Sequence, residues 1–312
     1  MERFLLAACL CMVAAPASAG ALRPGDFVMV TSAPGYSYRV VSIEPGSMAL
    51  TEVATGGYVS WNSDIAVNHQ GKVLITSPTS GIVRIDPISG QQTLFAPLDS
   101  LGIGTPAGLT IAEGGDIYVT MSGAWPRVIR LSSSGSLMSV VTSAGLLGSP
   151  EGLAFGRDGA LYVCEVQSPV VDDLARGSLV RVDPASGAQT RIAAGAPLYR
   201  PHDLAVAPDG ALWSIGYGIP NGHLRYVVRT VVADGSSYAV LGNYANGIAI
   251  RADGVTLIGN CDEAHLSCNA PYTYVYPSGP YLWSYNGSLA VVPEIATPAT
   301  STSWGRIKAL YR

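Results

Sequence analysis

Apolar and polar residues alternate in short runs along most of this chain, and glycine-containing turns separate the runs. Five segments share one layout: a small or polar residue, an alternating strand, a turn with glycine, and a second strand. This alternation is typical of β-strands, and no helical spacing of apolar residues accompanies it. The first strands of the five segments are Ser63–Val67, Ala107–Ile111, Glu151–Phe155, His202–Val206 and Asn246–Ile250.

The five segments form a regular repeat. Their first residues, called the anchors below, lie 44, 44, 51 and 44 positions apart. A third and a fourth strand follow, most clearly in Gly81–Phe95 and in Leu179–Ile192. A period of about 44 residues with four short strands is the signature of a β-propeller blade. We predict an all-β, six-bladed propeller of four-stranded antiparallel blades, with seven blades as the alternative. The second strands are expected at Lys72–Thr76, Asp116–Thr120, Ala160–Cys164, Ala211–Ile215 and Val255–Gly259.

The first blade lacks its innermost strand in the usual place, because the position 44 residues before Ser63 is residue 19. Its other three strands are expected at Phe27–Ser32, Tyr38–Ile43 and Met48–Val53. We expect the segment Arg306–Tyr311, near the C-terminus, to supply the missing strand. Such a strand would close the ring of blades.

Residues 1–19 have the pattern of a secretory signal peptide. Arg3 precedes the apolar run Phe4–Ala15, and Ala17-Ser18-Ala19 matches the small-residue pattern before a cleavage site. The run is shorter than the roughly 20 residues that a membrane-spanning helix needs. We therefore expect an exported protein, secreted or periplasmic, without a transmembrane segment. Residues 20–312 form a single propeller domain in this interpretation.

Composition and cysteine use fit this picture. The chain is 48% hydrophobic and only 13% charged, which excludes a disordered protein. Its net charge of −4 leaves no basic field for a nucleic-acid backbone, so no nucleic-acid partner is expected. Cys261 and Cys268 are predicted to form a disulfide in an oxidising compartment. Cys164 lies in an apolar run and is expected to be a buried, inert thiol, with a nucleophile as the alternative.

Propeller topology places the polar anchors on one face. The start of each first strand and the end of the second lie at the same end of a blade, because the two strands are antiparallel neighbours. Long loops after three second strands fall on this face, and binding residues are often carried by such loops. We expect the face to bind a small molecule or a protein. The predicted ligand contacts are Ser63, Asp64, His223 and His265.

The runs Pro150-Glu151-Gly152-Leu153-Ala154, Pro201-His202-Asp203-Leu204-Ala205 and Asn246-Gly247-Ile248-Ala249 resemble NHL-type repeats. The same layout occurs in six-bladed propellers of the senescence-marker/gluconolactonase group and of the streptogramin B lyase group. The gluconolactonase resemblance implies a glutamate and an asparagine before glycine as ligands of a divalent cation. Glu151 and Asn246 match that local pattern, whereas Ala107 removes one polar anchor. In the lyase resemblance, Asp203 stands where glycine follows the histidine.

Two functional hypotheses follow. In the first, the protein is a propeller that binds a ligand or partner without chemistry, as a monomer. In the second, it is a lactonase-type hydrolase or a lyase, in which Ca²⁺ or Mg²⁺ polarises a carbonyl and no organic cofactor takes part. Each residue also has a structural interpretation: Glu151 as a hydrated carboxylate, His202 as a polar residue near the axis, Asp203 as a cap of backbone amides. The enzyme hypothesis assigns His202, Asp203 and Glu165 to catalysis and Glu151, Asn246 and Asn260 to the metal.

Overall fold

The computed structural model of the chain describes only part of its residues. These are residues 21–33, 37–45, 47, 49–60, 64–98, 104–166, 177–217, 225–242, 245–254, 256–260, 273–276, 279–284 and 289–293. They form β-strands, arranged in four-stranded sheets. Within this part of the chain, no helix is long and apolar enough to cross a membrane. The all-β prediction is confirmed.

Three sheets, called blades 1 to 3, come from the first part of the chain, except for one strand of blade 1 that comes from a late segment. Blade 1 contains β1 (Phe27–Ala33), β2 (Ser37–Ile43), β3 (Leu50–Thr55) and β24 (Leu289–Val291). Blade 2 contains β4 (Ile65–Val67), β5 (Val73–Ser77), β6 (Gly81–Ile85) and β7 (Gln92–Ala96). Blade 3 contains β8 (Thr105–Ile111), β9 (Ile117–Ser122), β10 (Arg127–Leu131) and β11 (Leu137–Ser143).

Two further blades and a sixth sheet follow. Blade 4 contains β12 (Pro150–Phe155), β13 (Leu161–Val166), β14 (Gly177–Val182) and β15 (Gln189–Ala194). Blade 5 contains β16 (Asp203–Val206), β17 (Leu212–Tyr217), β18 (Arg225–Thr230) and β19 (Ser237–Gly242). The sixth sheet contains β20 (Ala245–Ile250), β21 (Thr256–Asn260), β22 (Thr273–Tyr276) and β23 (Gly279–Ser284).

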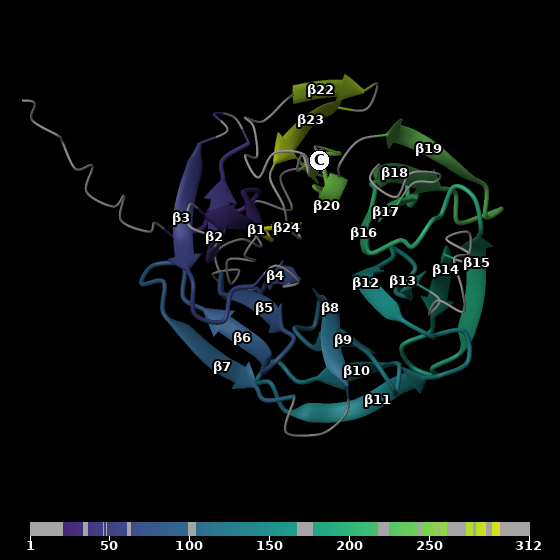
Figure 1. Cartoon of the computed structure of the whole chain (residues 1–312), viewed down its shortest axis with the longest axis horizontal. Coiled ribbons are helices and arrows are strands. Elements are labelled where there is room, and N and C mark those ends of the chain that lie inside the picture. The colour runs from purple at the N-terminus through teal and green to yellow at the C-terminus, as the bar shows by residue number, and fades with distance from the viewer. Residues whose placement is uncertain are drawn as a thin grey trace, which may run out of the picture.

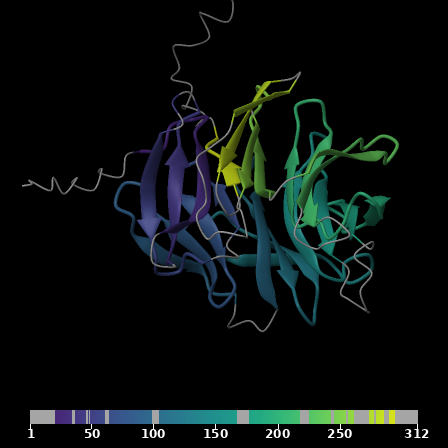
Figure 2. The ribbon, with the colours of Figure 1, turned by 45° about the horizontal axis from the view of Figure 1, so that its top comes forward.

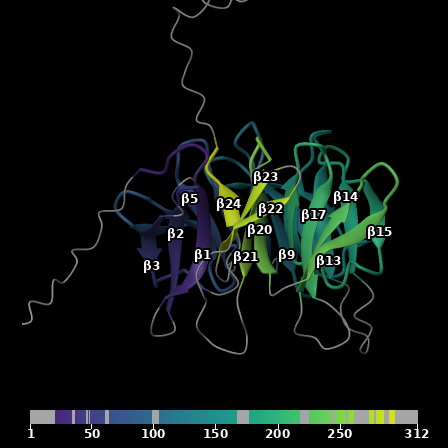
Figure 3. The same ribbon diagram turned by 90° about the horizontal axis from the view of Figure 1, so that it is seen from above.

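The sheets stand around a common axis as in a propeller. Strands β4, β8, β12, β16, β20 and β24 lie nearest the axis, whereas β3, β7, β11, β15 and β19 lie at the rim (Figure 1). Figures 2 and 3 show that the strands run roughly along the axis and that neighbouring sheets face each other. The predicted blade pattern of an inner first strand and an outer fourth strand is confirmed for blades 2 to 5.

The prediction of six antiparallel blades is met in part. Within the described residues, blades 1 to 5 are antiparallel throughout, with neighbouring strands in the predicted order. The sixth sheet has the order β20-β21-β23-β22, and β21 pairs with β23 in parallel. Strands β22 and β23 form an antiparallel hairpin that joins the sheet through its second strand instead of its first. This sheet therefore departs from the repeat, and five blades have the predicted form.

The inner strand of blade 1 comes from a different segment than the one predicted. Phe27, Val28 and Met29 of β1 pair with Val291, Ala290 and Leu289 of β24. The prediction that Arg306–Tyr311 supplies this strand is wrong in its choice of segment, because β24 occupies the place beside β1. Residues 306–311 themselves lie outside the described residues. The other three strands of blade 1 lie where the sequence predicted them, within about two residues.

The hydrophobic core lies between neighbouring sheets. Side chains alternate along each strand, so one set packs against the preceding blade and the other against the following one. In β13, Val163 packs with Tyr118 and Val128 of blade 3, while Cys164 packs with Leu204 and Leu212 of blade 5. Because both faces of these strands are covered, the middle strands read as continuous apolar runs.

Candidate functional site

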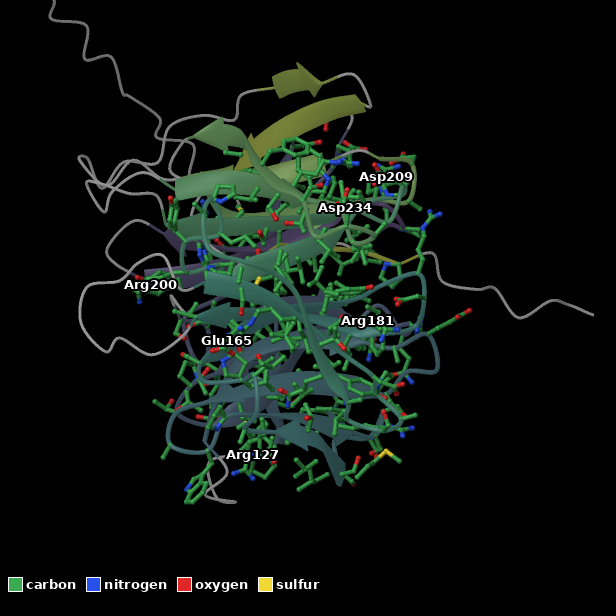
Figure 4. The ribbon with its side chains drawn as sticks, turned by 90° about the vertical axis from the view of Figure 1, so that its right-hand side faces the viewer. Arg127, Glu165, Arg181, Arg200, Asp209 and Asp234 are labelled. Carbon is green, nitrogen blue, oxygen red and sulfur yellow. The ribbon has the colours of Figure 1, made fainter. Side chains whose placement is uncertain are left out.

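The first residues of the inner strands lie beside residues at or near the ends of the second strands. Pro150 pairs with Glu165, Asp203 with Ile215, and Ala245 with Asn260. We call this end the loop face, and the opposite end, with the turns around Asp209 and Asp234, the turn face. Figure 4 shows Glu165 and Arg200 toward one end of the ring, and Arg181, Asp209 and Asp234 toward the other. The described anchors, Ala107, Glu151, His202 and Asn246, therefore share one end of the ring with Glu165 and Asn260, as their positions in the repeat predicted.

A β-bulge occurs at the anchor in several inner strands. The pairing register shifts between Pro106 and Leu109 in β8, between Pro150 and Leu153 in β12, and between Ala245 and Gly247 in β20. Each bulge adds one residue to the inner strand. A bulge changes the direction of the side chains around it and is frequent beside functional sites. Glu151 and Asn246 both stand in such bulges.

The glycine after the anchor allows the inner strands to approach one another. A Cβ atom on Gly152 would lie 2.8 Å from the carbonyl oxygen of His202 and 2.9 Å from the Cα of Asp203. A Cβ atom on Gly108 would lie 2.5 Å from the carbonyl oxygen of Glu151. The Gly152 N–H donates to the His202 carbonyl at 3.0 Å. A glycine after the anchor is therefore required because the inner strands pack closely around the axis.

Side chains on the second strands join each blade to the next. The Thr76 hydroxyl donates to the Ala107 carbonyl at 3.1 Å, and the Thr120 hydroxyl donates to the Glu151 carbonyl at 2.5 Å. Cys164 is a buried free thiol whose Sγ donates to the Asp203 carbonyl at 3.5 Å, and burial raises its pKa well above the usual range. The expectation of a buried thiol is confirmed. The sequence did not reveal that these side chains join one blade to the next, although Thr76, Thr120 and Cys164 are spaced by the 44-residue period.

Asp64 and Asp203 hold neighbouring inner strands in the same way. One oxygen of Asp64 accepts the N–H of Ile65 at 2.9 Å and the other accepts that of Leu109, in the next blade, at 2.7 Å. Asp203 accepts the N–H of Leu204 at 2.7 Å and that of Ile248, in the sixth sheet, at 2.8 Å. These bonds match the structural interpretation of Asp203 as a cap of backbone amides. Burial, and secondarily the charge of Asp64, raise the pKa of Asp203 well above its usual range.

Glu151 has a perturbed acid–base equilibrium. Its side chain is largely buried, and this burial raises its pKa from 4.5 to about 7. The Arg200 guanidinium opposes this rise, whereas the charges of Asp64 and Glu165 contribute to it. Unlike Asp64 and Asp203, the Glu151 carboxylate forms no hydrogen bond with any described residue. A strongly perturbed acid of this kind is typical of functional sites.

Glu165 is completely buried beneath the chain that joins blades 3 and 4. Its Oε1 accepts the N–H of Gly148 at 2.8 Å and that of Ser149 at 2.6 Å. Its Oε2 is buried and has no hydrogen-bond partner within the described part of the chain. The same is true of the hydroxyl of Ser178, the direct cross-strand partner of Glu165. Burial raises the pKa of Glu165, and the two backbone N–H groups oppose that rise.

The two faces differ in their charge balance. On the turn face, aspartates are paired with arginines: Arg181 with Asp158 at 2.9 Å, and Arg229 with Asp209 at 2.6 Å. On the loop face, Arg200 is the cation whose charge acts on Glu151, against the two acids Asp64 and Glu165. Arg191 also acts on Glu165, so Glu151, Asp64 and Glu165 with these two arginines carry one net negative charge when all are ionised.

Two residues of the loop face had no signal in the repeat. Arg200 has a φ of 44°, an uncommon backbone conformation for a residue other than glycine, in the connection between blades 4 and 5. Trp125 is 67% exposed in the loop between β9 and β10, which also opens on this face. Both lie in connecting segments outside the repeated positions, so no periodic pattern identifies them.

The remaining predicted site residues are placed only in part. The backbone of His202 joins β12 to β17, because its carbonyl accepts the Gly152 N–H and its own N–H donates to Ile215. Asn246 and Asn260 occupy the loop-face ends of β20 and β21. Ser63, His223, His265, Cys261 and Cys268 lie outside the described residues. Among the residues that are described, no three or more His, Cys, Asp or Glu side chains are grouped as a metal site.

Solved structures resemble this fold. A gluconolactonase from Xanthomonas campestris matches with a TM-score of 0.54 and 16% identity, over 88% of each chain. TolB from Acinetobacter baumannii matches with a TM-score of 0.58 and 14% identity, over 86% of this chain and 67% of that one. Nidogen in a complex with laminin matches with a TM-score of 0.55 and 16% identity, over 73% of this chain and 82% of that one. No family model and no curated protein matches the sequence. At these identities the likeness establishes the β-propeller fold.

Proposed function

We propose that this protein is an exported propeller that binds a small ligand, or a group on a partner protein, at its loop face, with Glu151 as the central contact. The observation that carries the proposal is the contrast among the acids of this face. The carboxylates of Asp64 and Asp203 accept hydrogen bonds from backbone N–H groups of neighbouring strands. The Glu151 carboxylate is largely buried, has a pKa near 7 and makes no such bond to the described residues. Burial without a partner destabilises the fold, which favours a role in binding.

A closed ring would hold this face rigid. We propose that the ring has six blades and that β24 closes it, with the sixth sheet as the last blade. The support is the antiparallel pairing of β24 with β1 and the apolar contact of Leu289 with Phe27, Met29 and Ala249. Residues 1–19 would act as the export signal. Binding groups on a rigid scaffold need no ordering when the ligand arrives.

A metal-assisted lactonase is the second candidate. It is favoured by the equivalent positions of Glu151 and Asn246, each in a bulge before a glycine at the same end of an inner strand. In this proposal Glu151, Asn246 and Asn260 hold Ca²⁺ or Mg²⁺, which polarises a lactone carbonyl, and His202 moves a proton. The gluconolactonase from Xanthomonas campestris shares the fold alone, so it does not favour this candidate over the first.

One experiment tests both candidates. A fragment library, Ca²⁺, Mg²⁺ and a panel of lactones are added to the wild-type protein while backbone amide NMR signals are recorded. Ligand binding at the loop face is expected to shift the Gly148 and Ser149 signals, and Glu151→Gln is expected to weaken it. Glu113→Gln, an exposed glutamate in the turn before β9, is the matched control. Binding that leaves these signals unchanged, or that Glu151→Gln does not affect, contradicts the proposal. Lactone turnover that requires a cation and His202 would support the lactonase.

A further inference from the structure

Two neighbouring polar groups lie buried in blade 4 without partners. Oε2 of Glu165 and Oγ of Ser178 are both inaccessible, and neither has a hydrogen-bond partner among the described residues. Glu165 and Ser178 are direct cross-strand partners, so their side chains lie on the same side of the sheet. Buried polar groups in folded proteins are almost always hydrogen-bonded. Two such groups side by side indicate a place built to accept a donor.

The charges around this pair favour a cationic donor. The charges of Glu165 and Asp64 both raise the pKa of Glu151, so two acids act on this carboxyl group. Arg200 is the base whose charge acts on Glu151. Arg191 is a second base, whose charge acts on Glu165. With the three acids ionised, the two guanidinium groups still leave an excess of one negative charge. A positively charged ligand group would relieve both this repulsion and the unpaired oxygen of Glu165.

The arrangement of acceptors fits a primary ammonium group. An ammonium carries three N–H donors and no acceptor. Glu165 Oε2, Ser178 Oγ and the Glu151 carboxylate offer three acceptors at the start of β12 and the adjoining ends of β13 and β14. A Ca²⁺ ion needs six to eight oxygen ligands. No group of three or more His, Cys, Asp or Glu side chains suited to a metal occurs within the described ranges.

We propose that the loop face of blade 4 contains a subsite for a protonated primary amine, held by Glu165 and Ser178 with Glu151 at its entrance. This inference rests on the proposed binding function and names the chemical class of its ligand. The amine nitrogen lies against Oε2 of Glu165, and the rest of the ligand extends over the loop face toward Glu151. The N–H groups of Gly148 and Ser149 hold Glu165 in position through its other oxygen.

The test uses butylammonium as the probe and matched compounds that lack one of its properties. Butanol lacks the charge, and butyltrimethylammonium keeps the charge but has no N–H donor. Titrations at pH 8 follow the Gly148 and Ser149 amide signals, which report directly on the Glu165 carboxylate. Butylammonium is expected to shift both signals in a saturable manner, whereas the other two compounds are expected to leave them unchanged.

Variants assign the binding to the proposed groups. Glu165→Gln keeps an acceptor for Gly148 and Ser149, and is expected to weaken butylammonium binding about tenfold or more, since a charged hydrogen bond is lost. Ser178→Ala is expected to weaken it several-fold, while Glu113→Gln leaves it unchanged. Affinity also falls about tenfold from pH 8 to pH 6, because Glu151, with a pKa of about 7, gains a proton over that range. Asp64, Glu165 and Arg200 are the charged groups that act on Glu151 in this titration.

The outcomes separate this inference from the binding function itself. Equal binding of butyltrimethylammonium, or unchanged affinity in both Glu165→Gln and Ser178→Ala, overturns the amine subsite. Shifts of Gly148 and Ser149 with Ca²⁺ alone and none with butylammonium also overturn it, in favour of a metal. If neutral or anionic ligands bind through Glu151 and amines do not, the inference fails and the proposed function stands. If nothing binds at the loop face, both fail.

Discussion

Asp64, Asp203 and Glu151 all lie on the loop face, but their immediate surroundings give them different roles. Asp203 and Asp64 each bind one N–H of their own strand and one of the next inner strand. Glu151 has no such partner among the described residues, and its pKa is raised to about 7, mainly by burial. At the scale of the residue, hydrogen bonds to the backbone therefore distinguish an acid that joins blades from one that remains available for a ligand.

The raised pKa of Glu151 predicts how stability depends on pH. An acid whose pKa is higher in the folded state than in the unfolded chain contributes most below its unfolded value, here 4.5. That contribution is lost as the pH rises through about 7. Glu151→Gln is therefore expected to raise the free energy of unfolding at pH 8 by about 1 to 3 kcal/mol, and to change it little at pH 4.5. Urea unfolding at the two pH values checks this; an equal effect at both contradicts it.

Asp203 and Asp64 allow a matched comparison. Asparagine has one acceptor oxygen where aspartate has two, so Asp203→Asn leaves one of the two N–H groups, of Leu204 or Ile248, without its acceptor. We expect a loss of about 1 to 3 kcal/mol in the free energy of unfolding, because this site is buried. Asp64→Asn is expected to cost less, since Asp64 is only half-buried. Thermal and urea unfolding measure both variants. A neutral Asp203→Asn would show that these bonds do not join the blades.

Strand ends are shaped by their neighbours in the ring. The inner strands β8, β12 and β20 each contain a bulge at the anchor. In β8 and β12, Gly108 and Gly152 follow the anchor and let adjacent strands approach closely. The start of these inner strands could be predicted in part, because the pair of an anchor and a following glycine recurs in the sequence with the period of the repeat. The bulge itself and the hydrogen bonds of Thr76 and Thr120 depend on the neighbouring blade, so the repeat of one blade does not reveal them.

Gly152→Ala tests the close approach of β12 to β16. The added Cβ would lie 2.8 Å from the His202 carbonyl oxygen, so the strands must move apart. We expect a loss of about 1 to 3 kcal/mol in the free energy of unfolding, as for other overpacked sites. Gly114→Ala, which meets nothing within 4 Å in the turn before β9, is the control and is expected to be nearly neutral. Similar losses in the two variants would contradict close packing at the axis.

At the scale of the whole molecule, a strand from late in the sequence pairs with one from early in the sequence. β24 completes blade 1 beside β1, and Leu289 packs with Phe27, Met29, Val41 and Ile43. If β24 closes the ring as proposed, its loss exposes an edge of blade 1 and frees the sixth sheet from its neighbour. A propeller blade buries its faces only between neighbours, so damage at one joint weakens the assembly.

Leu289→Ala tests this joint. Leu289 is 6% exposed, and its truncation is expected to lower the free energy of unfolding by about 2 to 4 kcal/mol. Leu50→Ala, at a site 46% exposed in the outer strand of the same blade, is the control and is expected to change it by less than about 0.5 kcal/mol. Hydrogen exchange should also rise in β1 and β20 of Leu289→Ala. Unchanged exchange there would exclude β24 as the strand that holds the ring closed.

The repeat alone is enough to predict the blade, because strand alternation and glycine turns are local and recur every 44 residues in most of the chain. It also predicts that Asp64, Glu151, Glu165 and His202 share one end of the ring. Three features could be seen only in the tertiary structure. They are the pairing of β24 with β1, the parallel pair in the sixth sheet, and the burial of Glu165 beside Ser178. The first two depend on pairing choices that the chain makes only when the blades assemble. The third depends on how completely the neighbouring blade excludes water from Glu165. This exclusion, with the hydrogen bonds available nearby, decides whether a carboxylate joins strands or is available to bind a ligand.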